Sequence, residues 1–103
     1  MSTTVTESTE RSRYEIYEGA DLAGFVAYRR SGNTLDLLHT ETESGFEGKG
    51  VAKRLVTETL DDARRRGLTV LPSCSYVRKV VAEHREDYLD LVPPEQRARF
   101  DLA

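Results

Sequence analysis

The chain has 103 residues and a formal net charge of −3; 38% of its residues are hydrophobic and 32% are charged. This length suits one domain with a modest core, and the charge balance gives no basic surface of the kind that binds nucleic acid. No apolar run approaches the roughly 20 residues of a membrane helix, and the first residues lack the apolar core of a signal peptide, so we expect a cytoplasmic protein without a membrane partner. A single cysteine, Cys74, excludes a disulfide within the chain, and with only two histidines no metal site is expected.

The N-terminal half predicts a tail followed by strands. Residues 1–12 are polar and rich in Ser, Thr and Glu, which predicts a flexible tail, and the domain is expected to span residues 13–103. Alternating apolar residues predict strands over 13–18, 22–30 and 34–42. Only short turns that contain glycine separate these strands, which favours an antiparallel three-strand meander.

An amphipathic helix is predicted from about Gly48 to Arg66, because apolar residues recur there at helical spacing. The residues of this apolar face are Val51, Leu55, Val56, Thr59, Leu60 and Ala63. Gly67 follows a basic triplet and suits the end of the helix. The apolar stretch 68–71 then predicts a fourth strand, which the crossover should place parallel to residues 34–42.

The C-terminal part predicts further helix. Ser73 or Ser75 is expected to cap a second helix that runs to about His84, and residues 93–95 favour another helical start. The predicted fold class is therefore α+β, that is, mixed α/β. It consists of the antiparallel meander, a glycine-rich loop leading into a helix, a parallel fourth strand and a C-terminal helix.

The glycine-rich stretch between the third strand and the first helix predicts an anion site. The first N–H groups of a helix lack partners within it, the helix dipole favours negative charge, and glycine lets a phosphate approach the backbone closely. Two nucleotide motifs do not fit, because Lys53 stands where the Rossmann pattern needs a third Gly or Ala, and no Gly-Lys-Ser/Thr run occurs. The stretch therefore indicates another diphosphate, such as that of coenzyme A.

The order of strand, glycine-rich turn, long helix, short strand and helix resembles the coenzyme A-binding half of the GNAT superfamily of N-acetyltransferases. That family's loop reads Gln/Arg-x-x-Gly-x-Gly/Ala; here Gly50 and Ala52 match, and Glu47 stands where the family has Gln or Arg. The chain is similar above all to a small single-domain branch, the YjdJ-like or N-acetyltransferase domain-containing proteins. This likeness covers roughly residues 13–92. The stretches that carry it are 14–15, 38–41, 46–52, 72–77 and 87–92.

The resemblance implies a minimal GNAT-like fold that moves an acetyl group from acetyl-CoA to a primary amine of a protein or a small molecule. It also implies that the end of the third strand pairs with pantetheine, and that the loop and helix start cradle the diphosphate. The implied contacts are Thr40, Thr42, Phe46, Glu47, Gly48, Lys49, Gly50, Val51, Ala52, Lys53 and Arg54. The basic side chains among them are either phosphate ligands or ordinary solvated residues.

Four side chains are candidates for the chemistry. His39, on the strand that should line the cleft, could take the proton of an ammonium, and Glu41 is the rival base; either could instead be an ordinary surface residue. Cys74 lies near a helix start that would stabilise a thiolate, so it could accept the acetyl group, protonate the departing thiolate, or simply pack as a small buried side chain. Tyr76 is the alternative proton donor, or a packing residue.

Two other functions stay open beside the acetyltransferase. One is a non-catalytic coenzyme A or acyl-CoA-binding module, and the other is a protein-interaction domain that has kept the fold and lost the ligand. A test of coenzyme A binding distinguishes the protein-interaction domain, which would not bind it, from the acetyltransferase and the binding module. A test of turnover with amines then distinguishes the acetyltransferase from the binding module. The sequence does not identify the amine acceptor, and we expect a monomer or a weak homodimer.

Overall fold

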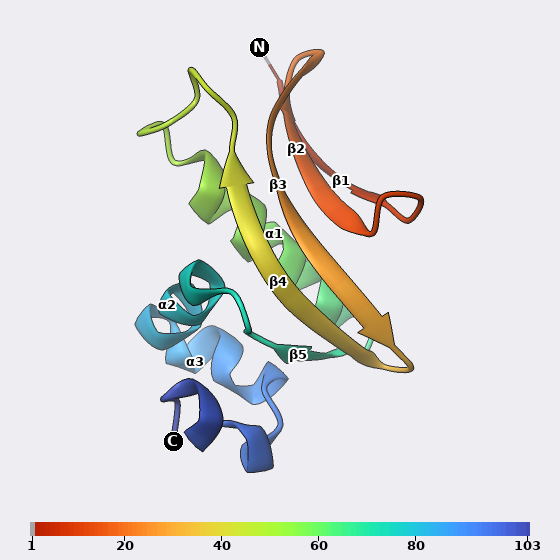
Figure 1. Cartoon of the computed structure of the whole chain (residues 1–103). Coiled ribbons are helices and arrows are strands. Elements are labelled where there is room, and N and C mark those ends of the chain that lie inside the picture. The colour runs from red at the N-terminus through yellow and green to blue at the C-terminus, as the bar shows by residue number, and fades with distance from the viewer. Residues whose placement is uncertain (1) are drawn as a thin grey trace.

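The computed structural model describes residues 2–103, and residue 1 lies outside this described part. One five-stranded sheet has the order β1-β2-β3-β4-β5. Its strands are β1 (Thr3–Ser8), β2 (Arg13–Glu18), β3 (Asp21–Ser31), β4 (Thr34–Thr42) and β5 (Thr69–Leu71). Strands β1 to β4 are antiparallel, whereas β5 runs parallel to β4. The strands twist strongly, so the sheet curls (Figure 1).

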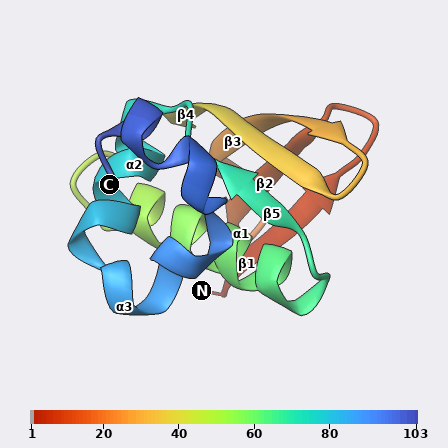
Figure 2. The ribbon, with the colours of Figure 1, turned by 90° about the horizontal axis from the view of Figure 1, so that it is seen from below.

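The helices leave one face of the sheet open. They are α1 (Val51–Arg65), α2 (Ser75–Glu83), α3 (Arg85–Tyr88) and the 3-10 turns η1 (Leu89–Leu91), η2 (Pro94–Gln96) and η3 (Ala98–Phe100). In Figure 1, α1 lies behind the sheet and no helix of the described chain lies in front of β2, β3 and β4. Figure 2 shows α2, α3 and the C-terminal turns gathered at the opposite end of the molecule from β1 and β2. The mixed α+β class predicted from the sequence is confirmed.

Residues 3–8 form strand β1, which corrects the predicted flexible tail over residues 1–12 within the part of that segment that the structure describes; residue 1 of the predicted tail lies outside it. Its Thr and Val residues favour extended structure, and its register pairs Val5 with Ile16 and places Glu7 opposite Tyr14. Val5 packs against the core. The polar composition of the segment reflects an edge strand that is only half-buried, so the predicted three-strand meander has four antiparallel strands.

Helix α1 begins three residues later than predicted. Gly48 and Gly50 have φ angles of 76° and 73°, in the left-handed region, so the helix starts at Val51. All six residues of the predicted apolar face are buried. Gly67, with φ 69°, follows the end of the helix as predicted. The parallel pairing of β5 with β4 is also confirmed, and it joins residues 69–71 to residues 34–36.

Neither serine caps α2, which corrects that expectation. Cys74 occupies the N-cap position without a side-chain capping bond, and Ser75 is the first helical residue. The Ser73 hydroxyl instead donates to Asp36 Oδ1 at 2.6 Å. The backbone N–H of Cys74 donates to the carbonyl of Leu37 at 2.8 Å, and this bond fixes where α2 begins.

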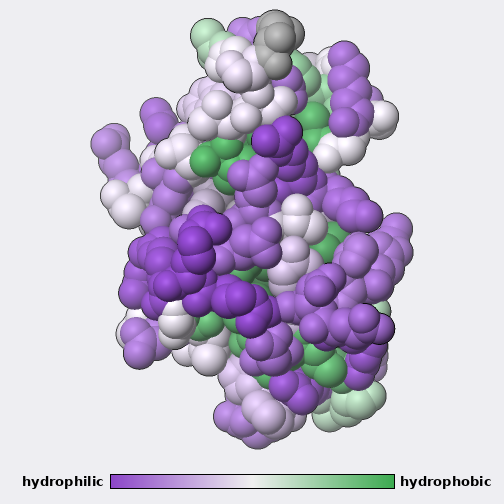
Figure 3. Space-filling view, turned by 180° about the vertical axis from the view of Figure 1, so that it is seen from behind, coloured by the Kyte–Doolittle hydropathy of each residue, from purple (hydrophilic) through white to green (hydrophobic). Residues whose placement is uncertain are grey.

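One hydrophobic core fills the space between the sheet and the helices. Its fully buried side chains include Ile16, Val26, Leu35, Leu37, Leu55, Val56, Leu60, Val70, Val77 and Leu102. The opposite side of α1 faces solvent, and Figure 3 shows that the surface seen from behind is mostly hydrophilic. No helix within residues 2–103 is long and apolar enough to cross a membrane.

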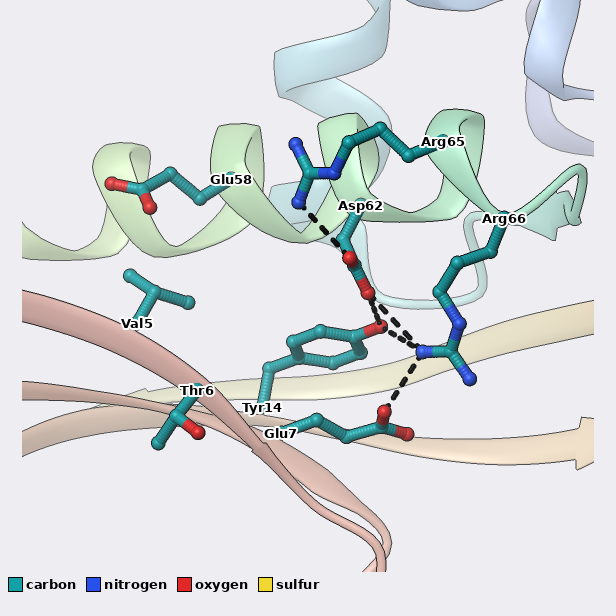
Figure 4. Close-up of a pocket in the computed structure, with 8 residues that line it drawn as sticks. All are labelled: Val5, Thr6, Glu7, Tyr14, Glu58, Asp62, Arg65 and Arg66. Carbon is teal, nitrogen blue, oxygen red and sulfur yellow. Dashed lines mark hydrogen bonds and ion pairs between the residues drawn. The ribbon is translucent and has the colours of Figure 1, made fainter.

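A clasp of five side chains ties β1 and its neighbours to the end of α1; it consists of Glu7, Tyr14, Tyr28, Asp62 and Arg66. Figure 4 shows all of them except Tyr28. The Tyr14 hydroxyl donates to Asp62 Oδ2 at 2.5 Å, and Arg66 Nη1 donates to the same oxygen at 3.2 Å. Arg66 Nη1 also donates to Glu7 Oε1 at 2.8 Å, and the Tyr28 hydroxyl donates to Glu7. The adjacent cavity of about 390 Å³ is lined by four residues of this clasp, Glu7, Tyr14, Asp62 and Arg66, together with Val5, Thr6, Glu58 and Arg65.

The clasp should make stability depend on pH in acid. Burial alone would raise the pKa of Asp62, but hydrogen bonds from Tyr14, Arg66 and Arg65 hold it below its ordinary value of 3.8. A carboxyl group with a lowered folded-state pKa stabilises the fold above its ordinary pKa, and that contribution is lost as the pH falls below it.

We therefore expect Asp62→Asn to lower the free energy of unfolding at pH 7 by about 1.5–3 kcal/mol, the range for hydrogen bonds to a charged group. The loss should shrink as the pH falls below the ordinary pKa of 3.8. Urea unfolding from pH 7 to pH 2.5 measures both. Asp21→Asn, at the exposed first residue of β3, is the matched control. An equal loss from Asp62→Asn at every pH would contradict the assignment.

Gly24 sets the distance between β3 and the end of β4. It lies opposite Thr42, and a Cβ built on Gly24 would lie 2.6 Å from the carbonyl oxygen of Glu41. Such an approach requires the backbone of one strand to move, so the absence of a side chain at Gly24 keeps the end of β4 in place.

Gly24→Ala should destabilise the fold by about 1–3 kcal/mol through overpacking and should shift the backbone amide resonances of residues 40–43. Urea unfolding and ¹H–¹⁵N spectra measure the two effects. Gly32→Ala is the control for the spectra, because a Cβ there meets no atom within 4 Å; its φ of 58° makes the substitution itself strained, so it is no control for stability. If the resonance changes were confined to β3, the claim that Gly24 keeps the end of β4 in place would be wrong.

Candidate functional site

The start of α1 presents a row of free backbone amides. The N–H groups of residues 48–53 make no hydrogen bond with any residue of the described chain, and the first bond of the helix runs from Arg54 N–H to the carbonyl of Gly50 at 3.2 Å. A Cβ on Gly48 or Gly50 would meet no atom within 4 Å, so the space in front of the loop is open. Free amides at a helix start, with open space before them, fit a phosphate group.

The loop side chains play different parts. Phe46 is half-buried and packs against the core, and the Lys49 ammonium lies 5.9 Å from the centre of its ring. The exposed Glu47 accepts a bond from the N–H of Gly45 at 2.9 Å. Glu47 thus braces the loop from the position where the GNAT pattern has Gln or Arg.

The first turn of α1 divides into inward and outward residues. Val51 is buried and Ala52 half-buried, so each can offer a ligand little beyond its backbone. Lys53 and Arg54 are exposed, and Arg54 Nε donates to Glu58 at 2.6 Å. Lys49 and Lys53 are therefore the basic side chains that remain as candidate phosphate ligands.

The second half of β4 has a strand partner on one side only. Strand β5 pairs with residues 34–36, and the chain then turns away into α2 after Cys74 bonds to Leu37. Residues 39–42 pair with β3 alone among the described strands, and Leu38 pairs with neither β3 nor β5. Their other edge therefore offers backbone donors and acceptors to an extended amide chain.

A bulge at Leu38 decides which way the candidate residues point. Tyr28 pairs with Leu37 and Ala27 pairs with His39, so Leu38 is an extra residue in β4. Strict alternation from the buried Leu37 would point His39 toward the core. The bulge instead places His39 and Glu41 on the open face of the sheet, and Thr40 and Thr42 on the α1 side.

On the α1 side, Thr40 and Cys74 meet. Thr40 Oγ1 lies 3.3 Å from Cys74 Sγ, and Cys74 is 7% exposed. Tyr76, in the first turn of α2, is half-buried and packs against the core. Burial, with a smaller contribution from Glu83, raises the pKa of Tyr76, so its hydroxyl keeps its proton. Two possible proton donors therefore lie where β4 and α2 separate.

On the open face, His39 and Glu41 form a pair. His39 Nε2 lies 2.7 Å from Glu41 Oε2, and both side chains are more than half exposed. The His39 ring also meets the ring of Phe25, with 6.4 Å between ring centres and 65° between the planes. The structure thus brings two catalytic candidates together and separates them from Cys74 by the thickness of the sheet.

The open face also contains residues that were not predicted as part of the site. Arg13 lies with its guanidinium 4.3 Å from the centre of the Phe25 ring, and Arg13 Nε donates to Glu15 Oε2 at 2.8 Å. Glu15 is only 3% exposed. The alternation of residues 13–18 already assigns Arg13 and Glu15 to one face, but it does not show that Phe25 and His39 share that face. No cluster of His, Cys, Asp and Glu within residues 2–103 is arranged to hold a metal ion.

Comparisons with known proteins agree with this geometry. A sequence model of the GCN5-related N-acetyl-transferase family matches residues 13–91. The chain is 36% identical over 62 residues to Protein NATD1 of Xenopus tropicalis, covering 59% of this chain and 57% of that protein. It is 34% identical over 61 residues to Protein NATD1 of Bos taurus, covering 58% and 54%. The match thus spans little more than half the length of these relatives.

A solved structure shares the fold. The solution structure of a GCN5-like protein from Staphylococcus aureus superimposes with a TM-score of 0.64 at 22% identity, covering 87% of each chain. At this identity the likeness concerns the fold alone. Because the family model spans nearly the whole domain, this chain belongs to the GCN5-related N-acetyl-transferase family.

Proposed function

We propose that the chain is an acetyl-CoA-dependent N-acetyltransferase that moves an acetyl group to a primary amine of a protein or a small molecule. The observation that carries the proposal is the continuity of two binding elements. The unpaired edge of residues 38–42 leads along the chain to the free amides of residues 48–53. An extended amide chain that lay along this edge would therefore bring its diphosphate to those free amides. Family membership supports the choice of acetyl-CoA.

In this proposal the donor lies along β4. The edge of residues 38–42 pairs with pantetheine, the amides of residues 48–53 hold the diphosphate, and Lys49 and Lys53 add positive charge. A backbone amide near Thr40 donates to the oxyanion that develops on the thioester carbonyl, a contribution that is often the largest in acyl transfer.

The acceptor approaches from the open face. An alkylammonium with an ordinary pKa of about 10.4 is almost fully protonated at pH 7, so a base must remove its proton before the nitrogen can attack. His39 is the base in this proposal, because it lies on the open face of the same part of β4 that would hold the donor. The amine then forms the C–N bond as the C–S bond breaks, and Cys74 or Tyr76 protonates the leaving thiolate.

The rival function is a non-catalytic coenzyme A-binding module. It uses the same loop and the same edge of β4, and Glu47 in place of the usual Gln or Arg is the feature that favours it. The two functions differ in turnover, which can be tested with a panel of peptides, polyamines and small amines. If the protein bound coenzyme A but acetylated none of these amines, the non-catalytic module would be the correct function.

Gly50→Asp should weaken acetyl-CoA binding at least tenfold, about 1.4 kcal/mol, because it adds a negative charge at the diphosphate and a side chain at φ 73°. Isothermal titration calorimetry measures the affinity. Gly32→Asp, at φ 58° in the turn between β3 and β4, is the matched control for the strain alone. If Gly50→Asp bound acetyl-CoA with unchanged affinity, the assignment of the loop to the binding site would be contradicted.

His39→Gln should lower turnover by roughly 10²-fold or more, because glutamine keeps hydrogen bonding but cannot act as the base. Coenzyme A affinity should stay within a factor of two. Equal turnover of variant and wild type would transfer the role to Glu41 or to water.

Cys74→Ala is the companion variant in the same assay. Direct transfer predicts that it keeps turnover within a few-fold and that intact-protein mass spectrometry finds no acetylated wild-type enzyme in the absence of amine. An acetyl adduct on Cys74 that is lost together with activity would establish covalent catalysis instead.

A further inference from the structure

The open face of the sheet carries two rows of side chains that cross all four antiparallel strands. The register aligns Ser8, Arg13, Ala27 and His39 in one row, and Thr6, Glu15, Phe25 and Glu41 in the next. Residues directly opposite in an antiparallel sheet point to the same face, so the members of each row are neighbours. His39 and Glu41 thus stand at the β4 end of a continuous surface.

Contacts along these rows hold the Phe25 ring in place. The buried Glu15 accepts bonds from Arg13 Nε at 2.8 Å and from the Tyr17 hydroxyl at 3.0 Å. Arg13 is thereby held over the face of Phe25, 4.3 Å from the ring centre, while the same ring meets the ring of His39 nearly edge to face. Opposite His39 stands the small Ala27, which leaves room for the imidazole to lie against the sheet.

We propose that Glu41 is a positioning residue that holds His39 in the tautomer with the proton on Nε2, so that Nδ1 is the nitrogen that takes the proton of the acceptor amine. The inference rests on the proposed function and names how its base is oriented. The Phe25 ring, held by Arg13 and Glu15, supports the imidazole from the side.

The tautomer follows from the donor inventory of the pair. An ionised carboxylate can only accept, and a neutral imidazole has one N–H donor and one acceptor nitrogen. The 2.7 Å contact between His39 Nε2 and Glu41 Oε2 therefore requires the proton on Nε2, which leaves the lone pair on Nδ1. A ring without this partner would divide between the two tautomers and between rotamers.

The proton transfer balances with this assignment. The ammonium N–H bond breaks and its proton goes to Nδ1, which gives a neutral amine and an imidazolium. Glu41 then faces that positive charge at hydrogen-bond distance. The amine lone pair forms the C–N bond with the thioester carbon, the C–S electron pair leaves with the thiolate, and the imidazolium returns its proton to solvent.

Exposure makes the pair easy to test, because ion pairs in water contribute little to stability. Glu41→Ala should therefore fold as the wild type does. Long-range ¹H–¹⁵N spectra of the His39 ring at pH 8 should show the Nε2–H tautomer in the wild type and a mixture in Glu41→Ala. Turnover in Glu41→Ala should fall at least about tenfold, as part of the roughly 10²–10⁴-fold contribution of a positioned base, with coenzyme A affinity within a factor of two.

Two further variants sharpen the result. Glu41→Gln has an amide oxygen that can accept from Nε2–H and an amide N–H that can donate to an unprotonated Nε2, so it should leave a mixture of tautomers and lower turnover as Glu41→Ala does. Glu43→Ala, one residue beyond the end of β4, is the matched control and should change neither. An unchanged tautomer in Glu41→Ala, or a turnover loss matched by lost coenzyme A affinity, overturns the positioning role alone. Absence of turnover in the wild type, with acetyl-CoA bound, overturns the proposed function itself.

Discussion

The separation of β5 from β4 is the constraint on which the candidate site depends. Their parallel pairing lasts three residues and ends at Leu71, because the next residue, Pro72, has no N–H to donate. Two residues later the N–H of Cys74 bonds to the carbonyl of Leu37, and the chain enters α2. A longer β5 would pair with residues 38–42 of β4 and would occupy the edge that the proposed donor needs.

The sheet then acts as a partition between the two halves of the proposed reaction. Thr40 and Cys74 meet on the α1 side, and His39 and Glu41 meet on the open side. Neighbouring residues of β4 therefore face different sides of the sheet, so in the proposed reaction they contact different reactants. A thioester held at the edge of β4 would be within reach from both faces, so the donor and the acceptor need not compete for one pocket. The clasp between β1 and α1 also lies on the α1 side, but at the C-terminal end of that helix, and its paired charges hold the curled sheet against the helix.

Much of the fold could be predicted from local patterns. The apolar face of α1, the three inner antiparallel strands and the parallel β5 follow from periodicity and from the short turns. Strand β1 was missed, because a half-buried edge strand has the composition of a tail and its main anchor is distant: Glu7 contacts Arg66, 59 residues along the chain. The cap of α2 was misplaced for a similar reason, since the bond from Cys74 to Leu37 outweighs the capping preference of serine.

Of the candidate site, the sequence supplied the residues but not their orientation. The loop glycines and the positions of His39, Glu41 and Cys74 follow from motif and resemblance, whereas the contacts of Phe25 with His39 and Arg13 depend on the register of three strands. Strand alternation alone would have turned His39 toward the core, because a bulge leaves no dependable mark in a single sequence.

The bulge at Leu38 also bears on how members of this family should be compared. Because side chains alternate along a strand, one extra residue exchanges the two faces for every position that follows it. A relative whose β4 has the same number of residues but no bulge would present the residue aligned with Thr40, and not the one aligned with His39, to the open face. Equivalent bases in divergent members can therefore occupy different alignment columns. A base that seems to be missing from a sequence alignment would then indicate that alternate residues of the strand have exchanged faces, and not that activity is lost.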